Sequence, residues 1–135
     1  MIESEHSHVF PQCQPVLEVR DVQAAIDWYL DKLAFELEFK VGDPPIYACL
    51  GRDVCSKGAP ACLRFTEWCR DRDEPANSGW LAIYVGDHVD ELYEEFRAKG
   101  VTFSRELANH DYGMREFEIR DCNGHYLRFG GLIEE

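Results

Sequence analysis

The alternation of hydrophobic and polar residues follows the same order in two separate stretches of this chain. The first stretch, PVLEVRDVQAAIDWYLDKLAF from Pro15 to Phe35, reads as a strand followed by an amphipathic helix, and ACLRF at 61–65 reads as a later strand. The second stretch, WLAIYVGDHVDELYEEFRAKGVTF from Trp80 to Phe103, repeats strand and helix, and YLRF at 126–129 again supplies a later strand. Together with the strands between them, these stretches predict the order βαβββ twice, over halves 14–68 and 80–131.

Both predicted helices carry one hydrophobic stripe at helical spacing. The stripes consist of Val22, Ala25, Ile26, Tyr29, Leu30 and Leu33, and of Val89, Leu92, Tyr93 and Phe96. Asp21 stands where an N-cap residue accepts a hydrogen bond, and Gly100 stands where the second helix ends. Each stripe predicts a helix that packs one face against a sheet.

Side chains alternate between the two faces of a strand, so the sequence also predicts which residues face away from the helices. In the opening strands this helix-free face receives Gln14, Val16 and Glu18, and Trp80, Ala82 and Tyr84. In the strand after the first helix we expect Phe35, Leu37, Phe39 and Val41 opposite Glu36, Glu38 and Lys40. The predicted fold class is α+β, with two βαβββ repeats forming a curved mixed sheet, an open concave face and the helices outside.

The segments between these elements predict loops, and the length predicts one domain. Residues 51–60 and 70–79 lack periodicity and are rich in turn formers or charges, which indicates a loop and the linker between the halves. Asp121-Cys122-Asn123-Gly124 predicts a turn into the last strand. A chain of 135 residues fits a single domain over 1–135.

The charge balance argues against a nucleic-acid partner. The chain has 14 basic and 26 acidic residues, a net charge of −12, whereas phosphate binding requires a concentrated positive surface. The acidic excess would attract a cationic ligand, or it serves solubility alone.

The chain has no targeting segment or membrane span that its sequence reveals. Met1 to Val9 lacks the basic start and the apolar stretch of a signal peptide, and no apolar run is long enough for a spanning helix. We therefore expect a cytoplasmic protein without a membrane partner. The six cysteines contain no C-x-x-C pair, which favours reduced thiols over disulfides or a zinc site at Cys55, Cys62 and Cys69.

These segments resemble the vicinal oxygen chelate superfamily, which includes glyoxalase I, extradiol dioxygenases, fosfomycin-resistance proteins and bleomycin-resistance proteins. PVLEVRDVQAAIDWYLDKLAFE is similar to its first strand and helix, and DELYEEFRAKGV, YGMREFEIRD and DCNGHYLRF are similar to its second half. Ala34 replaces a glycine that is usual in this superfamily at the end of the first helix, so we expect strain there.

The resemblance implies four positions at which the metalloenzymes of the superfamily place His, Glu or Gln as ligands. These positions read Gln14, Arg64, Trp80 and Arg128 here. Guanidinium and indole groups offer a metal no lone pair, and an alignment shift of one residue adds only Cys13 as a donor. We therefore expect neither a metal nor another cofactor.

The five histidines provide no clear catalytic candidate. His6, His8, His88, His110 and His125 fall in the tail, at a helix start, in a loop and after a turn, where solvated or capping roles are favoured. His110, which lies near Tyr112 in the sequence, is the one to follow.

A larger set of polar and aromatic residues is predicted to share one surface. The set comprises Glu18, Glu38, Thr66, Trp80, Tyr84, Tyr112, Glu116, Glu118 and Tyr126, with Arg64 and Arg128. Arginines paired with carboxylates allow a polar cleft without a metal ion, or they only hold the halves together. Aromatic side chains on an open face favour a bound ligand.

Within the superfamily, the metal-free acidic members with an aromatic groove are the bleomycin-resistance proteins, which sequester the drug without altering it. The resemblance implies groove positions at Glu38, Phe39, Thr66, Tyr84 and Tyr112, with Tyr112 in place of the usual tryptophan. The predicted ligand-binding residues are Glu38, Phe39, Thr66, Trp80, Tyr84, Tyr112, Glu116, Arg64 and Arg128. Flat rings of a ligand would stack on the aromatic residues, while carboxylates attract its cationic tail. The groove of that family lies between two subunits, which implies a homodimer.

The predicted function is therefore metal-independent binding of a small molecule, with no catalytic residue. Two alternatives on the same fold stay open: a metal-dependent lyase, isomerase or dioxygenase, and a metal-free enzyme that uses Glu116 or Glu118 as a base.

Overall fold

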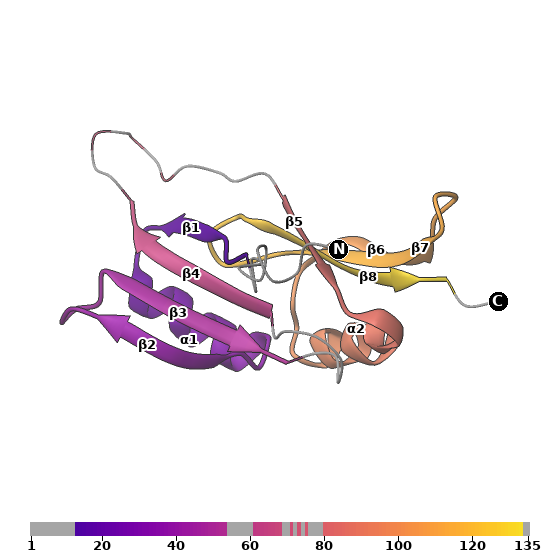
Figure 1. The fold of residues 1–135 in the computed structure, drawn as a ribbon, viewed down its shortest axis with the longest axis horizontal. Coiled ribbons are helices and arrows are strands. Elements are labelled where there is room, and N and C mark those ends of the chain that lie inside the picture. Colours follow the sequence, from indigo (N-terminus) through magenta and orange to yellow (C-terminus); the bar gives the residue numbers. More distant parts are fainter. Residues whose placement is uncertain are drawn as a thin grey trace, which may run out of the picture.

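Each half of the chain forms its own four-stranded mixed sheet with one helix against it (Figure 1). The computed structural model describes residues 13–53, 61–68, 71, 73, 75 and 80–133. The first half contains β1 (Val16–Val19), α1 (Val22–Lys32), β2 (Glu36–Val41), β3 (Tyr47–Arg52) and β4 (Ala61–Glu67). The second contains β5 (Trp80–Tyr84), the short 3₁₀ helix η1 (Gly86–His88), α2 (Val89–Ala98), β6 (Phe103–Asn109), β7 (Met114–Arg120) and β8 (Tyr126–Leu132). The predicted α+β fold of two βαβββ repeats is confirmed, with the strands in two four-stranded mixed sheets where one curved sheet was expected.

The two sheets have equivalent strand orders. These are β1-β4-β3-β2 and β5-β8-β7-β6, with the opening strand of each half parallel to its closing strand and the other neighbours antiparallel. The predicted tail at 1–9, residues 54–60 of the predicted loop, and most of the predicted linker lie outside the described residues. Within the described part of the chain, neither helix is long and apolar enough to cross a membrane.

The helices form where the stripes predicted them. The α1 stripe buries Val22, Ala25, Ile26 and Tyr29, whereas Leu30 of the predicted stripe is exposed. Asp21 caps the helix by accepting a hydrogen bond from the backbone N of Ala24 at 3.0 Å. After the helix, Ala34 has φ 55°, the left-handed conformation that a side chain disfavours. The strain expected at this position is confirmed.

The hydrophobic core is one cluster to which both halves contribute. Rings pack edge to face within it, as between Tyr29 and Phe65 at 4.9 Å and between Phe96 and Phe129 at 5.4 Å. Continuous burial of this kind supplies most of the stability of a domain.

Buried and half-buried polar contacts also join the halves. The Tyr29 hydroxyl on α1 donates to Asp121 Oδ2 at 2.6 Å, and the His125 ring bonds the backbone O of Glu18 at 2.9 Å. Arg52 at the end of β3 donates two hydrogen bonds to Glu95 on α2, at 2.6 and 2.9 Å. The expectation of a solvated or capping role is therefore wrong for His125, which is 2% exposed and links the halves.

A β-bulge changes the face assignment in β2. The register shifts between Leu37 and Phe39, so that Phe39 lies opposite Cys49 on β3. An extra residue in one strand moves the following side chains to the other face. Leu37 packs against the core, whereas Phe39 is 42% exposed and stacks with Tyr47. The simple alternation that placed Phe35, Leu37, Phe39 and Val41 on one face is wrong for Phe39 and Val41, which both follow the bulge and are exposed.

Candidate functional site

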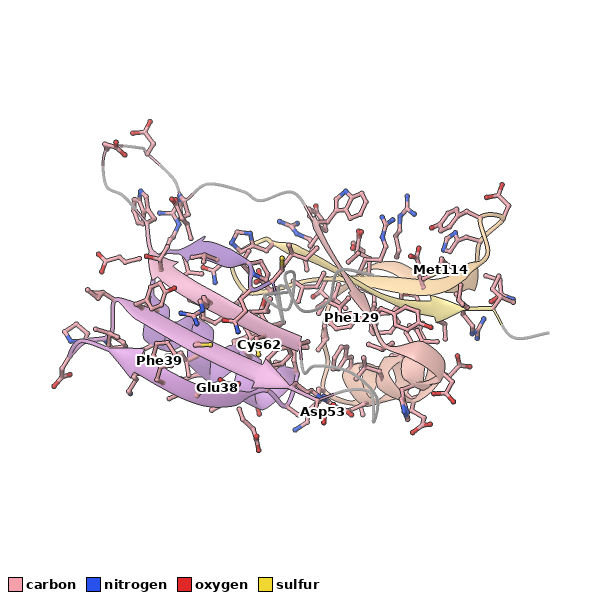
Figure 2. The ribbon with its side chains drawn as sticks, viewed as in Figure 1. Glu38, Phe39, Asp53, Cys62, Met114 and Phe129 are labelled. Carbon is pink, nitrogen blue, oxygen red and sulfur yellow. The ribbon has the colours of Figure 1, made fainter. Side chains whose placement is uncertain are left out.

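The predicted site residues fall into two groups, one on the helix-free face of each sheet. Glu38, Phe39, Arg64 and Thr66 belong to the first sheet, and Figure 2 shows Glu38 and Phe39 on β2. Trp80, Tyr84, Glu116 and Arg128 belong to the second sheet, and Tyr112 lies in the turn before β7. Figure 1 shows α1 behind the first sheet and α2 below the second, so the two helix-free faces point in different directions.

The first group is centred on Arg64 of β4. Arg64 Nε donates to Gln14 Oε1 at 2.6 Å, and Arg64 Nη1 donates to the Tyr47 hydroxyl at 3.3 Å. The guanidinium also lies 5.4 Å from the centre of the Phe39 ring, within the range of a cation–π contact. The hydrogen bond to Tyr47 raises the pKa of the guanidinium further, so Arg64 is a permanent cation.

Glu38 lies beside this group and contacts a thiol. Its Oε2 atom accepts a contact from Cys62 Sγ at 3.7 Å (Figure 2). Thr66 follows Arg64 by two residues on the same face, opposite Tyr47 in the register of β3 and β4. The predicted pairing of Arg64 with a carboxylate is wrong within the described residues, where Arg64 bonds the amide of Gln14 and the phenol of Tyr47.

The second group is centred on Arg128 of β8, which pairs with carboxylates as predicted. Arg128 donates to Glu118 Oε2 through Nε at 3.2 Å and through Nη2 at 2.9 Å, and its Nη1 lies 4.0 Å from Glu116 Oε1. Ser104 donates to the other oxygen of Glu118 at 2.8 Å, and the Tyr112 hydroxyl donates to Glu116. This bond raises the pKa of the Tyr112 hydroxyl, so the phenol stays protonated and acts as a donor.

Three aromatic side chains are exposed over this charged network. Trp80, Tyr84 and Tyr112 are 55%, 59% and 56% exposed, although large aromatic side chains are usually covered. Arg128 lies over one face of Trp80, at 4.2 Å from the ring centre, and His110 stacks on Tyr112 at 5.1 Å with an interplanar angle of 10°. The second helix-free face therefore presents aromatic surface above a floor of carboxylates and one arginine.

The four positions at which the resemblance implies metal ligands do not fit a metal here. Gln14 lies next to Arg64, whose Nε–H is directed at the Gln14 oxygen, and Trp80 lies next to Arg128. A cation held against these side chains would meet two permanent positive charges and one amide oxygen. Among the described residues, no group of three or more His, Cys, Asp or Glu side chains could hold a metal ion.

Sequence reasoning missed several residues of the two groups. Tyr47 and Cys49 line the first group beside Arg64, and Ser104 and His110 support the second. Alternation along β3 could have revealed Tyr47 and Cys49. Ala48 and Leu50 face the core, so the residues between them face the other side of the sheet.

The duplicated βαβββ fold, with a helix-free face on each sheet, defines the structural class of this domain. The sequence profile described as Glyoxalase/Bleomycin resistance protein/Dioxygenase superfamily matches residues 8–129. The chain belongs to this superfamily. No protein with a curated description matches the chain.

Several solved structures share the fold. A glyoxalase/bleomycin resistance protein/dioxygenase from Nocardioides has 19% identity and a TM-score of 0.69, with 98% of this chain and 91% of that chain covered. A superfamily member from Sphaerobacter thermophilus has 22% identity and a TM-score of 0.70, with coverage of 91% and 98%. A lactoylglutathione lyase from Agrobacterium tumefaciens has 18% identity and a TM-score of 0.68, with coverage of 92% and 95%. These likenesses show a shared fold, and fold alone does not decide function.

Proposed function

We propose that this chain is a metal-independent small-molecule-binding protein of the bleomycin-resistance type, which sequesters a flat cationic aromatic ligand without modifying it. The observation that carries the proposal is the exposure of Trp80, Tyr84 and Tyr112 above the ion-paired Arg128. Exposed rings provide stacking surface, and a quaternary or protonated group is attracted both to ring faces and to the acidic chain of net charge −12.

The state of the carboxylates supports binding over catalysis. Glu116 accepts a hydrogen bond from Tyr112, and Glu118 accepts from Ser104 and Arg128. A general base needs a lone pair directed at the proton it removes, whereas these carboxylates already hold the side chains around them. Their arrangement fits a rigid floor for a ligand.

We further propose that the binding groove forms between two copies of the chain. Within one chain the two helix-free faces point in different directions (Figure 1), so they cannot enclose one ligand together. In a dimer, Trp80 of one copy and Phe39 of the other would line the two walls of one groove. Ligand pockets usually enclose most of a bound molecule, which a single open face cannot do. Sedimentation should give the mass of a dimer at the concentration at which binding saturates; a monomer that binds with full affinity would contradict this arrangement.

A titration of metal-depleted protein with metal-free bleomycin tests the proposed function. We expect saturable quenching of tryptophan fluorescence and recovery of the drug intact. The double variant Tyr84→Ala/Tyr112→Ala should weaken binding about tenfold or more, since each aromatic contact contributes about 0.5–1.5 kcal/mol beyond its area. Leu30→Ala, which removes an exposed apolar side chain from α1, is the control and should bind normally. Unchanged affinity in the double variant, or metal purified in stoichiometric amount, would refute the proposal.

A further inference from the structure

Arg64 lies on the helix-free face of the first sheet, where no described residue supplies it with a carboxylate partner. Arg64 donates hydrogen bonds to two neutral groups, the amide oxygen of Gln14 and the hydroxyl of Tyr47. Across the described residues no carboxylate lies within ion-pairing distance of Arg64, although Glu38 shares this face and the chain carries 26 acidic residues. A half-buried guanidinium in such surroundings keeps a positive charge that no carboxylate in the described part of the chain neutralises.

The duplication of the fold provides an internal comparison for this charge. Arg64 and Arg128 occupy equivalent positions in β4 and β8. Cys49 lies opposite Arg64 on the neighbouring strand, and Glu118 lies opposite Arg128 in the same way. Two residues earlier on these neighbouring strands, Tyr47 corresponds to Glu116. The second half therefore neutralises its arginine with two carboxylates, and the first half has a thiol and a phenol there instead.

Aromatic rings line the approach to this cation. Phe39 and Tyr47 stack with ring centres 6.4 Å apart and an interplanar angle of 25°. The Arg64 guanidinium lies 5.4 Å from the first ring centre and 6.0 Å from the second. Phe39 is 42% exposed because the bulge in β2 turns it away from the core. An apolar ring surface thus lies beside an arginine that, among the described residues, has no carboxylate partner.

We propose that Arg64, Phe39 and Tyr47 form a binding site for an oxyanion carried on a flat apolar ring, such as an aromatic carboxylate. The guanidinium Nη2 edge donates to the oxyanion, and the attached ring packs against Phe39. This site lies on the first sheet, whose Phe39 also lines the groove proposed above between two copies, and it goes beyond that proposed function because it selects a ligand of the opposite charge. It stands even if the second sheet does not bind a cationic ligand.

The test follows the Nε–H signal of Arg64 by ¹⁵N NMR while the full chain is titrated with 2-naphthoate. The neutral isostere 2-naphthamide is the matched control probe, and 2-naphthyl phosphate distinguishes a carboxylate from a phosphate source. We expect 2-naphthoate to shift the Arg64 signal saturably and to bind about tenfold or more tightly than the amide, as expected for a charge-assisted hydrogen bond. Equal binding of 2-naphthoate and 2-naphthamide would overturn the proposal.

Variants separate the charge of Arg64 from general effects. Arg64→Gln should lose about tenfold or more of the 2-naphthoate affinity. Cys49→Glu, which copies the carboxylate of the second half, should cause a similar loss while the arginine is kept. Arg97→Gln changes the net charge equally on the exposed side of α2 and should bind normally. Wild-type affinity for 2-naphthoate in Arg64→Gln would also overturn the proposal. If that variant does not fold, the comparison of 2-naphthoate with 2-naphthamide on wild-type protein tests the proposal instead. Because bleomycin is followed through tryptophan and 2-naphthoate through Arg64, failure of one site is distinguishable from failure of the other.

Discussion

Removal of one buried hydroxyl should measurably loosen the attachment of the first half to the second. The Tyr29 hydroxyl is fully buried on α1 and donates to Asp121 Oδ2 at 2.6 Å, across 92 positions of sequence. The other oxygen of Asp121 accepts from the backbone N of Asn123 and of His125, both at 2.8 Å. Tyr29→Phe keeps the ring in the core and leaves one oxygen of a buried carboxylate without this donor.

The expected loss of unfolding free energy follows from the charge of the acceptor, the Asp121 carboxylate. A hydrogen bond to a charged group contributes about 1.5–3 kcal/mol, so we expect the free energy of unfolding to fall by about 2 kcal/mol. With an m value on the order of 2 kcal/mol per M in urea, the unfolding midpoint should fall by about 1 M. Burial and the neighbouring Asp121 raise the pKa of Tyr29, so the hydroxyl remains a donor at any pH used for the measurement.

Urea unfolding followed by circular dichroism measures this change. Tyr84→Phe is the matched control, because it removes the hydroxyl of a tyrosine that is 59% exposed; its effect should stay within about 0.5 kcal/mol. A double-mutant cycle with Asp121→Ala should give a coupling energy of about 1 kcal/mol or more between the two side chains. If Tyr29→Phe is as stable as Tyr84→Phe, the buried bond does not stabilise the packing of the halves.

Three further changes test particular features of the fold by urea unfolding. Ala34→Gly should stabilise the protein by about 0.5 kcal/mol, because relief of the left-handed strain, at least about 1 kcal/mol, exceeds the added entropy of the unfolded chain. Gly131→Ala should destabilise it by about 2 kcal/mol or more, because the new Cβ would lie 1.9 Å from the backbone O of Gly86. Glu95→Gln should cost about 0.5–1 kcal/mol near pH 7. Arg52 holds the pKa of Glu95 below its ordinary value of 4.5, so this difference from wild type should be complete above pH 4.5 and should disappear as pH falls through the lowered pKa.

Each of these changes has a control or a contrary outcome. Ala24→Gly, inside α1, should lower stability by about 0.5–1 kcal/mol, opposite in sign to Ala34→Gly. A Gly131→Ala protein as stable as wild type would show that the strand does not approach Gly86 so closely. A Glu95→Gln difference that grows on acidification would contradict the assigned ion pair with Arg52.

Much of the fold was predictable because its rules are local. Period-two alternation correctly placed Trp80 and Tyr84 on the helix-free face, and the N-cap at Asp21 and the strain at Ala34 followed from single positions. The bulge before Phe39 was not predictable in this way, since no turn residue marks it and the extra residue depends on pairing with β3. Alternation therefore assigned candidate site residues to the correct face of a strand, except where the register of the strand shifts.

The residue pattern was enough to predict the two βαβββ repeats, the residue types at the four positions Gln14, Arg64, Trp80 and Arg128, and the strand face of these side chains. Which groups meet depends on the folded chain: Arg128 bonds Glu118, whereas Arg64 bonds Gln14 and Tyr47. The tertiary structure also decided that His125 is buried between the halves. The reason is physical. Hydrophobic periodicity specifies the face of an element, but a contact between residues far apart in sequence depends on strand register and on how the halves pack.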